Sequence, residues 1–285
     1  MLDAIALSGE VNAAAGARLP RAHGAARIIF KRCGPNTVLD RLYQQGSLRV
    51  RLPRMPAGER PEAILLNTAG GATGGDAFHT RVLLQPGAAA VVTSQAAERV
   101  YRSGGGEAVI ENRLELGAGA SLDWLPQETI LFDRCQLERR LSVDLGAGAT
   151  FLAVEALILG RQASGERVTH AHVLDSWRIR RGGRLVFADT LRLEGDVAGL
   201  SGGAAIFGGA TAMALLVSIS PDSERRLEPL REALASAPCE AGASAWNGLL
   251  TARILAPDGR RLRVGLLAAL GALRDRIQPP RVWLC

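Results

Sequence analysis

The feature that most restricts the fold is a glycine turn that recurs about every 30 residues. Gly87-Ala88 precedes the run AAVVTSQ, Gly119-Ala120 precedes SLDWLPQ and Gly148-Ala149 precedes TFLAVE, at steps of 32 and 29 residues. Gly183, before RLVFAD, extends the series by a looser step of 35 residues. Each unit ends in a second run that returns to the next glycine, such as Ala108–Leu116. This period predicts stacked β layers, each too small to bury its own apolar face. Ordinary strand pairs joined by glycine turns are the alternative.

The repeat predicts a mainly β protein, with a layered and partly repeated structure that is either solenoid-like or built from stacked sheets. Before the repeat, Leu48–Leu52 alternates apolar and basic residues, which is the period of a half-buried strand. Ala63–Leu66 follows a proline-rich segment as a short apolar run suited to a buried strand. We expect a leader of variable sequence over residues 1–20 and a single β-rich domain over residues 21–285.

Helical patterns enter only in the C-terminal third, where we expect about two helices. Pro229–Ala235 contains good helix formers, with the proline in the first turn. Leucines at 266, 270 and 273 and the isoleucine at 277 recur at helical spacing before a Pro-Pro pair. Between these segments, Leu249–Leu255 and Arg261–Val264 are expected to be strands on either side of a turn at Pro257-Asp258-Gly259.

Composition and charge narrow the class of protein. Apolar residues make up 47% of the chain and charged residues 22%, as expected of a globular protein with a sizeable core. The net charge of +6 comes almost wholly from arginines scattered among acids, with Lys31 the only lysine. This mixture favours a solvated surface or a protein interface over a nucleic-acid stripe. The four cysteines are widely spaced and form no C-x-x-C pair, so we expect reduced thiols and a cytoplasmic protein.

One uncharged stretch invites a membrane interpretation. No charged residue lies between Asp196 and Asp222, a length that would span a bilayer. The first half of this stretch is rich in glycine and other small residues, so we expect two buried strands with Gly208-Gly209 between them. On this interpretation the chain has no membrane segment. A transmembrane helix is the alternative.

The stretch Leu65–Asp76, LLNTAGGATGGD, ends a β-like run with two Gly-Gly pairs and a single acid. Glycine reaches positive φ without a Cβ clash, so this loop must turn tightly or approach another group closely. It lacks the Lys-Ser or Lys-Thr ending of a P-loop, and Asp76 would repel a phosphate. It also fails as a dinucleotide fingerprint, because Ala77–Leu84 alternates like a strand where a helix should begin.

The same loop resembles the signature of the urease accessory protein family UreD, called UreH in some organisms. Four later segments match that family in order: Thr93–Ser103 (TSQAAERVYRS), Leu125–Ile130 (LPQETI), Leu159-Gly160-Arg161 with Gly165-Glu166, and Pro280–Trp283 (PRVW). The resemblance extends from about residue 25 to the C-terminus. Each motif is weak alone, but five motifs in register are a specific signal.

This resemblance implies a non-catalytic scaffold in cytoplasmic urease maturation. Proteins of the family bind apo-urease and the accessory protein UreF, which recruits the GTPase UreG, and nickel is delivered to the urease active site. The implied protein is part of a hetero-oligomeric complex, with no tightly bound cofactor and only transient nickel. The family fold is β-rich with a few helices, and an internal passage has been proposed as the nickel route.

The resemblance also implies candidate functional residues. We expect the acids at the matched motif positions to line a polar path for nickel, with Arg102 and Arg161 orienting or pairing with them. The matched positions are Asp76, Glu98, Tyr101, Arg102, Glu128, Glu155, Arg161 and Glu166. Four of these acids, at 98, 128, 155 and 166, also follow apolar runs of the repeat, so equivalent layers would bring them near one another. Solvated acids at strand ends are the alternative.

The best metal candidate by spacing is His170-x-His172, because two histidines at this spacing face one side of a strand, with Asp175 nearby. Neither a G-x-S-x-G elbow nor an H-E-x-x-H motif is present, and no spacing supports a Cys–His nucleophile pair. We therefore do not expect an enzyme. A β-layer binding module for another partner or ligand is the main alternative function, and a hydrolase that uses cysteine or histidine is the third.

Overall fold

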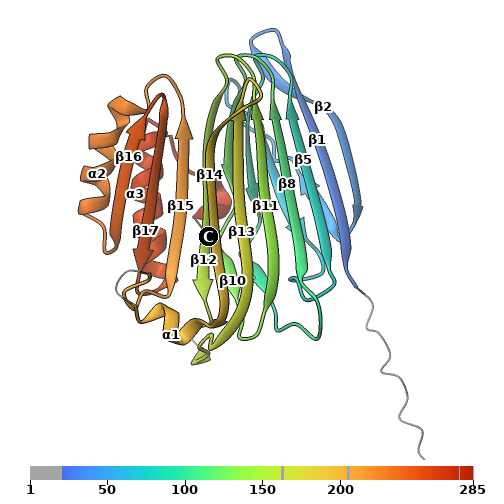
Figure 1. Ribbon diagram of the computed structural model, residues 1–285. Coiled ribbons are helices and arrows are strands. Elements are labelled where there is room, and N and C mark those ends of the chain that lie inside the picture. The colour runs from blue at the N-terminus through green and yellow to red at the C-terminus, as the bar shows by residue number, and fades with distance from the viewer. Residues whose placement is uncertain (1–20, 162–163, 204–205, 276, 285) are drawn as a thin grey trace, which may run out of the picture.

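Two β-sheets form the body of the computed structural model, which describes residues 21–161, 164–203, 206–275 and 277–284 (Figure 1). The leader expected over residues 1–20 lies outside the described residues. Sheet A has seven strands in the order β14-β13-β11-β8-β5-β1-β2. In that order they span Arg184–Asp196, His170–Arg181, Gln136–Leu145, Ala108–Leu116, Ala77–Leu84, His23–Cys33 and Asn36–Gly46.

Sheet B has ten strands, eight of them in the order β16-β17-β15-β12-β9-β6-β4-β3. In that order these span Glu240–Trp246, Leu249–Ala256, Ala212–Ile219, Thr150–Leu159, Ser121–Leu125, Ala89–Ser94, Glu62–Asn67 and Leu48–Arg51. The remaining two are short: β10 (Thr129–Leu131) lies between β12 and β7 (Glu98–Val100). The mainly β, layered fold is as predicted.

The middle of the chain winds between the two sheets in solenoid-like coils. Strands β5, β8, β11 and β13 are parallel neighbours in sheet A, and β4, β6, β9 and β12 are parallel neighbours in sheet B. The turns at Gly87, Gly119 and Gly148 carry the chain from sheet A to sheet B at the same corner of each coil. All three glycines have φ between 64° and 70°, the left-handed region that favours glycine. The repeat at these three positions is confirmed.

The prediction that Gly183 forms a fourth corner of the repeat was wrong. Gly182 and Gly183 have φ of 56° and 79° and form the tight turn of a hairpin, in which β14 runs antiparallel to β13 in the same sheet. A two-residue Gly-Gly turn with positive φ reverses the chain in the way that a strand's twist favours. The chain therefore turns back along sheet A instead of crossing to sheet B, and β14 ends the stack of coils.

Two apolar cores lie on the two faces of sheet B. The first fills the space between the sheets and contains the largest buried side chains, among them Trp124, Trp177 and Phe151. The second lies between sheet B and the C-terminal helices and includes Leu216, Leu266 and Trp283. Strand β12 is buried along almost its whole length because both of its faces are covered.

Three α-helices occur in the described residues: α1 (Val197–Ser201), α2 (Leu227–Ala235) and α3 (Gly259–Leu273). Two short 3-10 turns, η2 (Glu224–Arg226) and η3 (Arg281–Trp283), complete the C-terminal part. Helices α2 and α3 pack on the outer side of β15, β16 and β17 (Figure 1). The two helices expected in the C-terminal third are present, together with the one-turn α1.

Two local predictions in this region were wrong. The described part of the uncharged stretch after Asp196 holds one strand, β15, and not two. The Asp196 carboxylate accepts a hydrogen bond from the Gly199 amide and caps α1 at its start, so a helical turn lies where the first strand was expected. Arg261–Val264 lies inside α3 and is not a strand. The Asp258 carboxylate accepts from the Arg261 amide at 2.7 Å, so the Pro-Asp-Gly segment begins a helix where a turn between strands was expected.

The isoleucine at 277 lies beyond the end of α3 at Leu273, so the expected helical spacing stops one turn early. None of the helices in the described ranges has the length and apolar character needed to cross a membrane.

Candidate functional site

The glycine-rich loop packs against the next coil, and its acid closes it. One oxygen of the Asp76 carboxylate accepts from the Thr73 amide at 2.9 Å, and the other accepts from the Ala22 amide at 2.7 Å. Asp76 is buried and joins the loop to the strand that begins the domain. A Cβ on Gly71 would lie 2.4 Å from the Tyr101 ring, so the loop requires glycine there. Asp76 therefore has a structural role in closing this loop.

A row of contacts, which includes the buried ring of Phe132, connects four successive coils at this corner. The Tyr101 hydroxyl donates to the Gly70 carbonyl at 3.2 Å, and its ring meets Phe132 edge-on with centroids 4.7 Å apart. The Arg161 guanidinium lies 4.5 Å above the Phe132 ring and donates to Glu166 at 2.8 Å. Successive members are separated by 31, 31 and 29 residues. Three of the motif segments, at Gly70, Tyr101 and Arg161 with Glu166, therefore meet at one corner of the stack.

A second row, directed into the space between the sheets, begins at Asn67. The Asn67 amide nitrogen lies 3.2 and 3.3 Å from the two carboxylate oxygens of Glu98. Thr129 lies opposite Glu98 in the parallel register of β10 and β7. The Thr129 hydroxyl accepts a hydrogen bond from Arg139 at 3.0 Å. We call this series the polar line. Its members are Asn67, Glu98, Thr129, Arg139 and the two acids that pair with Arg139, Asp175 and Glu155.

Arg139 is the centre of a charged cluster between the two sheets. Its guanidinium forms a bidentate pair with Asp175, at 3.0 and 2.6 Å, and lies 3.2 Å from Glu155. Glu155 also accepts hydrogen bonds from the indole nitrogens of Trp124 at 3.4 Å and Trp177 at 3.1 Å. Arg139, Asp175 and Glu155 each expose 7% or less of their surface, so two buried carboxylates share one buried cation.

Burial shifts the proton affinity of the acids along this line. Loss of solvation raises the pKa of Glu155 to about 7, and the neighbouring Asp175 adds to the rise, whereas Arg139 and the two indoles oppose it. Loss of solvation also raises the pKa of Glu98, against the hydrogen bond from Asn67. A polar interior with acids of raised pKa is typical of functional sites as well as of structural ion-pair networks.

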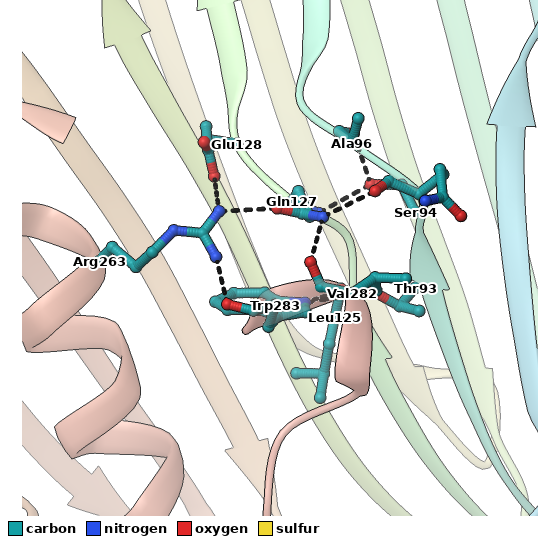
Figure 2. Close-up of polar contacts among 10 residues, drawn as sticks. Thr93, Ser94, Ala96, Leu125, Gln127, Glu128, Arg263, Val282 and Trp283 are labelled. Carbon is teal, nitrogen blue, oxygen red and sulfur yellow. Dashed lines mark hydrogen bonds and ion pairs between the residues drawn. The ribbon is translucent and has the colours of Figure 1, made fainter. Parts of the chain in front are cut away.

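Glu128 belongs to a different network on the opposite face of sheet B (Figure 2). The Arg263 guanidinium of α3 donates to Glu128 at 2.9 Å, to the Gln127 side chain at 2.7 Å and to the Trp283 carbonyl at 2.8 Å. Trp283 is buried, and its indole nitrogen donates to the Leu125 carbonyl at 3.0 Å. We call this network the C-terminal latch, because it holds the last residues against sheet B.

The expected nickel path thus divides into separate groups. Glu98 and Glu155 lie on the polar line, Glu128 is in the latch, and Glu166 with Arg161 lies at the surface corner. In the described part of the chain, each of these glutamates has its own polar partner. Arg102 is exposed, and its guanidinium forms no ion pair with the described residues, although its carbonyl accepts from the Thr73 hydroxyl.

The two histidines of the expected metal pair lie on the outer face of β13, as the alternation of a strand requires. His172 lies 4.0 Å from Glu194, whereas Asp175 has the opposite parity and faces the interior, so its expected place beside the histidines was wrong. Among the described residues, no group of three or more His, Cys, Asp or Glu side chains is arranged to hold a metal ion. Burial raises the pKa of the Cys135 thiol to about 12, the reverse of an activated nucleophile.

Sequence reasoning missed Arg139, both tryptophans of the cluster and Arg263. The signal for Arg139 was present: in β11 it has the same parity as Leu137, Leu141 and Val143, which are buried. A charge on the apolar side of a strand predicts a buried charge that needs a partner. Asp175 has the same relation to Val173 and Trp177 in β13.

Comparison with known proteins identifies the family of this chain. The family model described as UreD urease accessory protein matches residues 22–284. A urease accessory protein UreD of Xanthobacter autotrophicus is 50% identical over 263 residues, covering 92% of this chain and 90% of the relative. A UreD of Agrobacterium fabrum is 46% identical over 281 residues, covering 99% of this chain and 98% of the relative. The chain therefore belongs to the UreD family of urease accessory proteins.

Proposed function

We propose that this chain is a non-catalytic scaffold of urease maturation in the cytoplasm. It binds apo-urease and UreF, meets UreG through UreF and assists delivery of nickel to the urease active site. Its place in the UreD family supports the role in urease maturation. The observation that carries the nickel part of the proposal is the polar line, which runs from half-buried Asn67 to fully buried Glu155.

The chemistry of the polar line suits an ion in transit. Its ligands are carboxylate, amide and hydroxyl oxygens, which bind a divalent first-row metal less tightly than a thiolate and imidazole cage. A nickel ion on this line would compete with the Arg139 guanidinium for Asp175 and Glu155. In the absence of the ion, the Arg139 guanidinium neutralises the two carboxylates. When the ion binds them, the Thr129 hydroxyl offers the guanidinium a neutral partner.

The decisive experiment is co-expression of this chain with a urease operon that lacks only its own member of this family. Urease activity and the nickel content of purified urease are measured together. We expect restored activity with nickel in the enzyme. If the protein is soluble but captures neither that operon's UreF nor urease, and activity stays absent, the scaffold proposal is wrong. Capture of both without rescue would favour a binding module of another kind.

The path itself is tested by glutamate-to-glutamine variants in the same assay. Glu155→Gln removes a carboxylate from the polar line, and we expect less nickel in urease with unchanged capture of UreF and apo-urease. Glu128→Gln is the matched control, since it makes the same change on the opposite face of sheet B. Equal nickel content in the two variants, both folded by circular dichroism, would contradict the path.

A further inference from the structure

The outer face of sheet A carries a groove that the polar line and the latch do not use. It has a volume of about 800 Å³ and lies over β2, β1, β5 and β8. The helices lie on the far side of the molecule from these strands (Figure 1). The size is within the range of about 300–1,000 Å³ that is common for ligand pockets. Room for several side chains of a partner is therefore available on this face.

The charge in the groove is arranged as a row. Arg27, Arg81 and Arg113 lie opposite one another in the register of β1, β5 and β8. Like charges directly opposite in a sheet repel, so such a row lowers stability unless acids neutralise it. Glu115 lies 2.8 Å from both Arg81 and Arg113, and one acid thus serves two arginines. The row keeps an excess of positive charge.

Arg27 of this row and Arg41 of β2, which lies opposite Ile29, are the groove's arginines without a matching acid in the described part of the chain. Both are exposed, both line the groove, and neither forms an ion pair with any residue that the structure describes. Other arginines of the same face are paired: Arg140 with Glu111 at 2.7 Å, and Arg192 with Glu194 at 2.5 Å. The groove thus contains two exposed arginines with no carboxylate partner among the described residues.

Apolar surface lies between these charges. The lining includes Ala25 and Ile29 of β1, both half-buried, and Tyr43 of β2, whose side chain is 54% exposed. Tyr43 lies opposite Arg27, so the aromatic ring continues the row of arginines to the edge of the sheet. Tyrosine and arginine are enriched at protein interfaces, and here they are exposed around a small apolar floor.

We propose that this groove docks an acidic segment of a protein partner, with carboxylates on Arg27 and Arg41 and an apolar side chain on the floor beside Tyr43. A protein segment is favoured over nucleic acid by the apolar floor, which a phosphate backbone has no apolar side chain to fill. The proposal does not depend on nickel passage, because the groove and the polar line lie on opposite faces of sheet A.

The test measures binding of a fluorescein-labelled 20-residue synthetic peptide of Glu, Asp, Leu and Ser to the full chain by fluorescence anisotropy. We expect saturable binding that weakens as salt rises, because exposed ion pairs are screened. The double variant Arg27→Glu, Arg41→Glu should weaken binding at least tenfold, and Tyr43→Ser by a few fold. Arg184→Glu, an exposed arginine on the far edge strand β14, is the control and should stay within twofold of the wild type.

Three results would overturn the proposal. The first is no binding of the acidic peptide, or binding that the double variant leaves unchanged. The second is equal binding of a peptide in which Lys and Arg replace the acids. The third is tighter binding of a labelled single-stranded oligonucleotide with the same loss in the double variant, which would make the groove a nucleic-acid site. Rescue of urease by the wild-type chain is scored separately, so failure here leaves the scaffold proposal standing.

Discussion

Two arginine-centred networks lie on opposite faces of sheet B, and they differ in how their charge is balanced. Arg139 is buried between the sheets and serves two buried carboxylates, Asp175 and Glu155. Arg263 is partly exposed and binds one carboxylate, Glu128, together with neutral acceptors. The first network pairs two carboxylates with one cation in the buried interior, whereas the second pairs one carboxylate with one cation and is partly exposed. The first network contains Glu155, whose pKa is raised to about 7 by burial.

The difference teaches which network is a functional candidate. Excess buried charge costs stability unless something binds it, so the Arg139 cluster is suited to exchange a cation or a proton. The latch has no such excess, and its hydrogen bonds fasten the C-terminal residues to sheet B. The following changes test this contrast, from the largest expected effect to the smallest.

Replacing Arg139 by methionine should have the largest effect. Asp175 and Glu155 would remain buried without a cation, and breaking a buried pair in this way costs about 3–5 kcal/mol. The free energy of unfolding from urea titration at pH 7 measures the loss. Adding Asp175→Asn and Glu155→Gln to the same variant should recover much of it. A stable single variant would show that the cluster is not held together by charge.

Stability should depend on pH through Glu155. Its pKa is raised from 4.5 to about 7 in the folded state, so the folded protein binds a proton that the unfolded chain has released in this window. This contribution is complete below about pH 4.5 and is lost as pH rises to about 7, on the order of 3 kcal/mol in all. Urea titrations at several pH values should show this decline in the wild type relative to Glu155→Gln. If stability changed with pH in the same way in both proteins, the proton taken up on folding would not be bound at Glu155.

Arg263→Ala should lower the free energy of unfolding by about 1–2 kcal/mol, because it removes hydrogen bonds to Glu128, Gln127 and the Trp283 carbonyl at a partly exposed site. Thermal unfolding measures the change. Limited proteolysis should cut the C-terminal residues faster than in the wild type. A loss as large as that expected for the Arg139 variant would erase the contrast between the networks.

Arg27→Glu should have the smallest effect on stability. Arg27 is exposed and lies in a row of like charges, so the variant is expected to be within about 0.5 kcal/mol of the wild type, on the stabilising side. Thermal unfolding at low salt checks the sign. A clear loss of stability would mean that Arg27 stabilises the fold. It would contradict the view that the row of like charges is kept for binding.

Much of the fold could be predicted because its signals are local. Glycines at 87, 119 and 148 need positive φ at each corner, and strand alternation gave the inward faces of β5 and β3. Gly182-Gly183 misled because the same residue type serves a corner and a hairpin, and only the partner strand distinguishes them. Arg261–Val264 misled because a single Asp258 hydrogen bond decides between a turn and a helix start.

The candidate site was less predictable because it depends on contacts between coils. Motif positions gave Glu98 and Glu155 but could not tell that Glu128, one residue from Thr129, faces the other core. Arg139 belongs to no matched motif. Its strand parity predicts burial, but its partners follow only from the pairing of β11 with β13 and from the packing of sheet A on sheet B. The sequence shows which residues can bind or donate. Which of them lie together depends on how the strands of neighbouring coils are aligned.

The two rows at the motif corner restrict which changes of chain length the protein tolerates. Asn67, Glu98 and Thr129 are spaced by 31 residues, and each contacts or faces the next. A one-residue insertion in the strand that carries a row member would turn that side chain to the opposite face and break both rows at once. Loops outside the corner, such as the exposed 56–59 segment, bear no such constraint. Length variation among relatives should therefore gather in those loops, and an alignment gap inside Glu98–Val100 or Thr129–Leu131 should be rare.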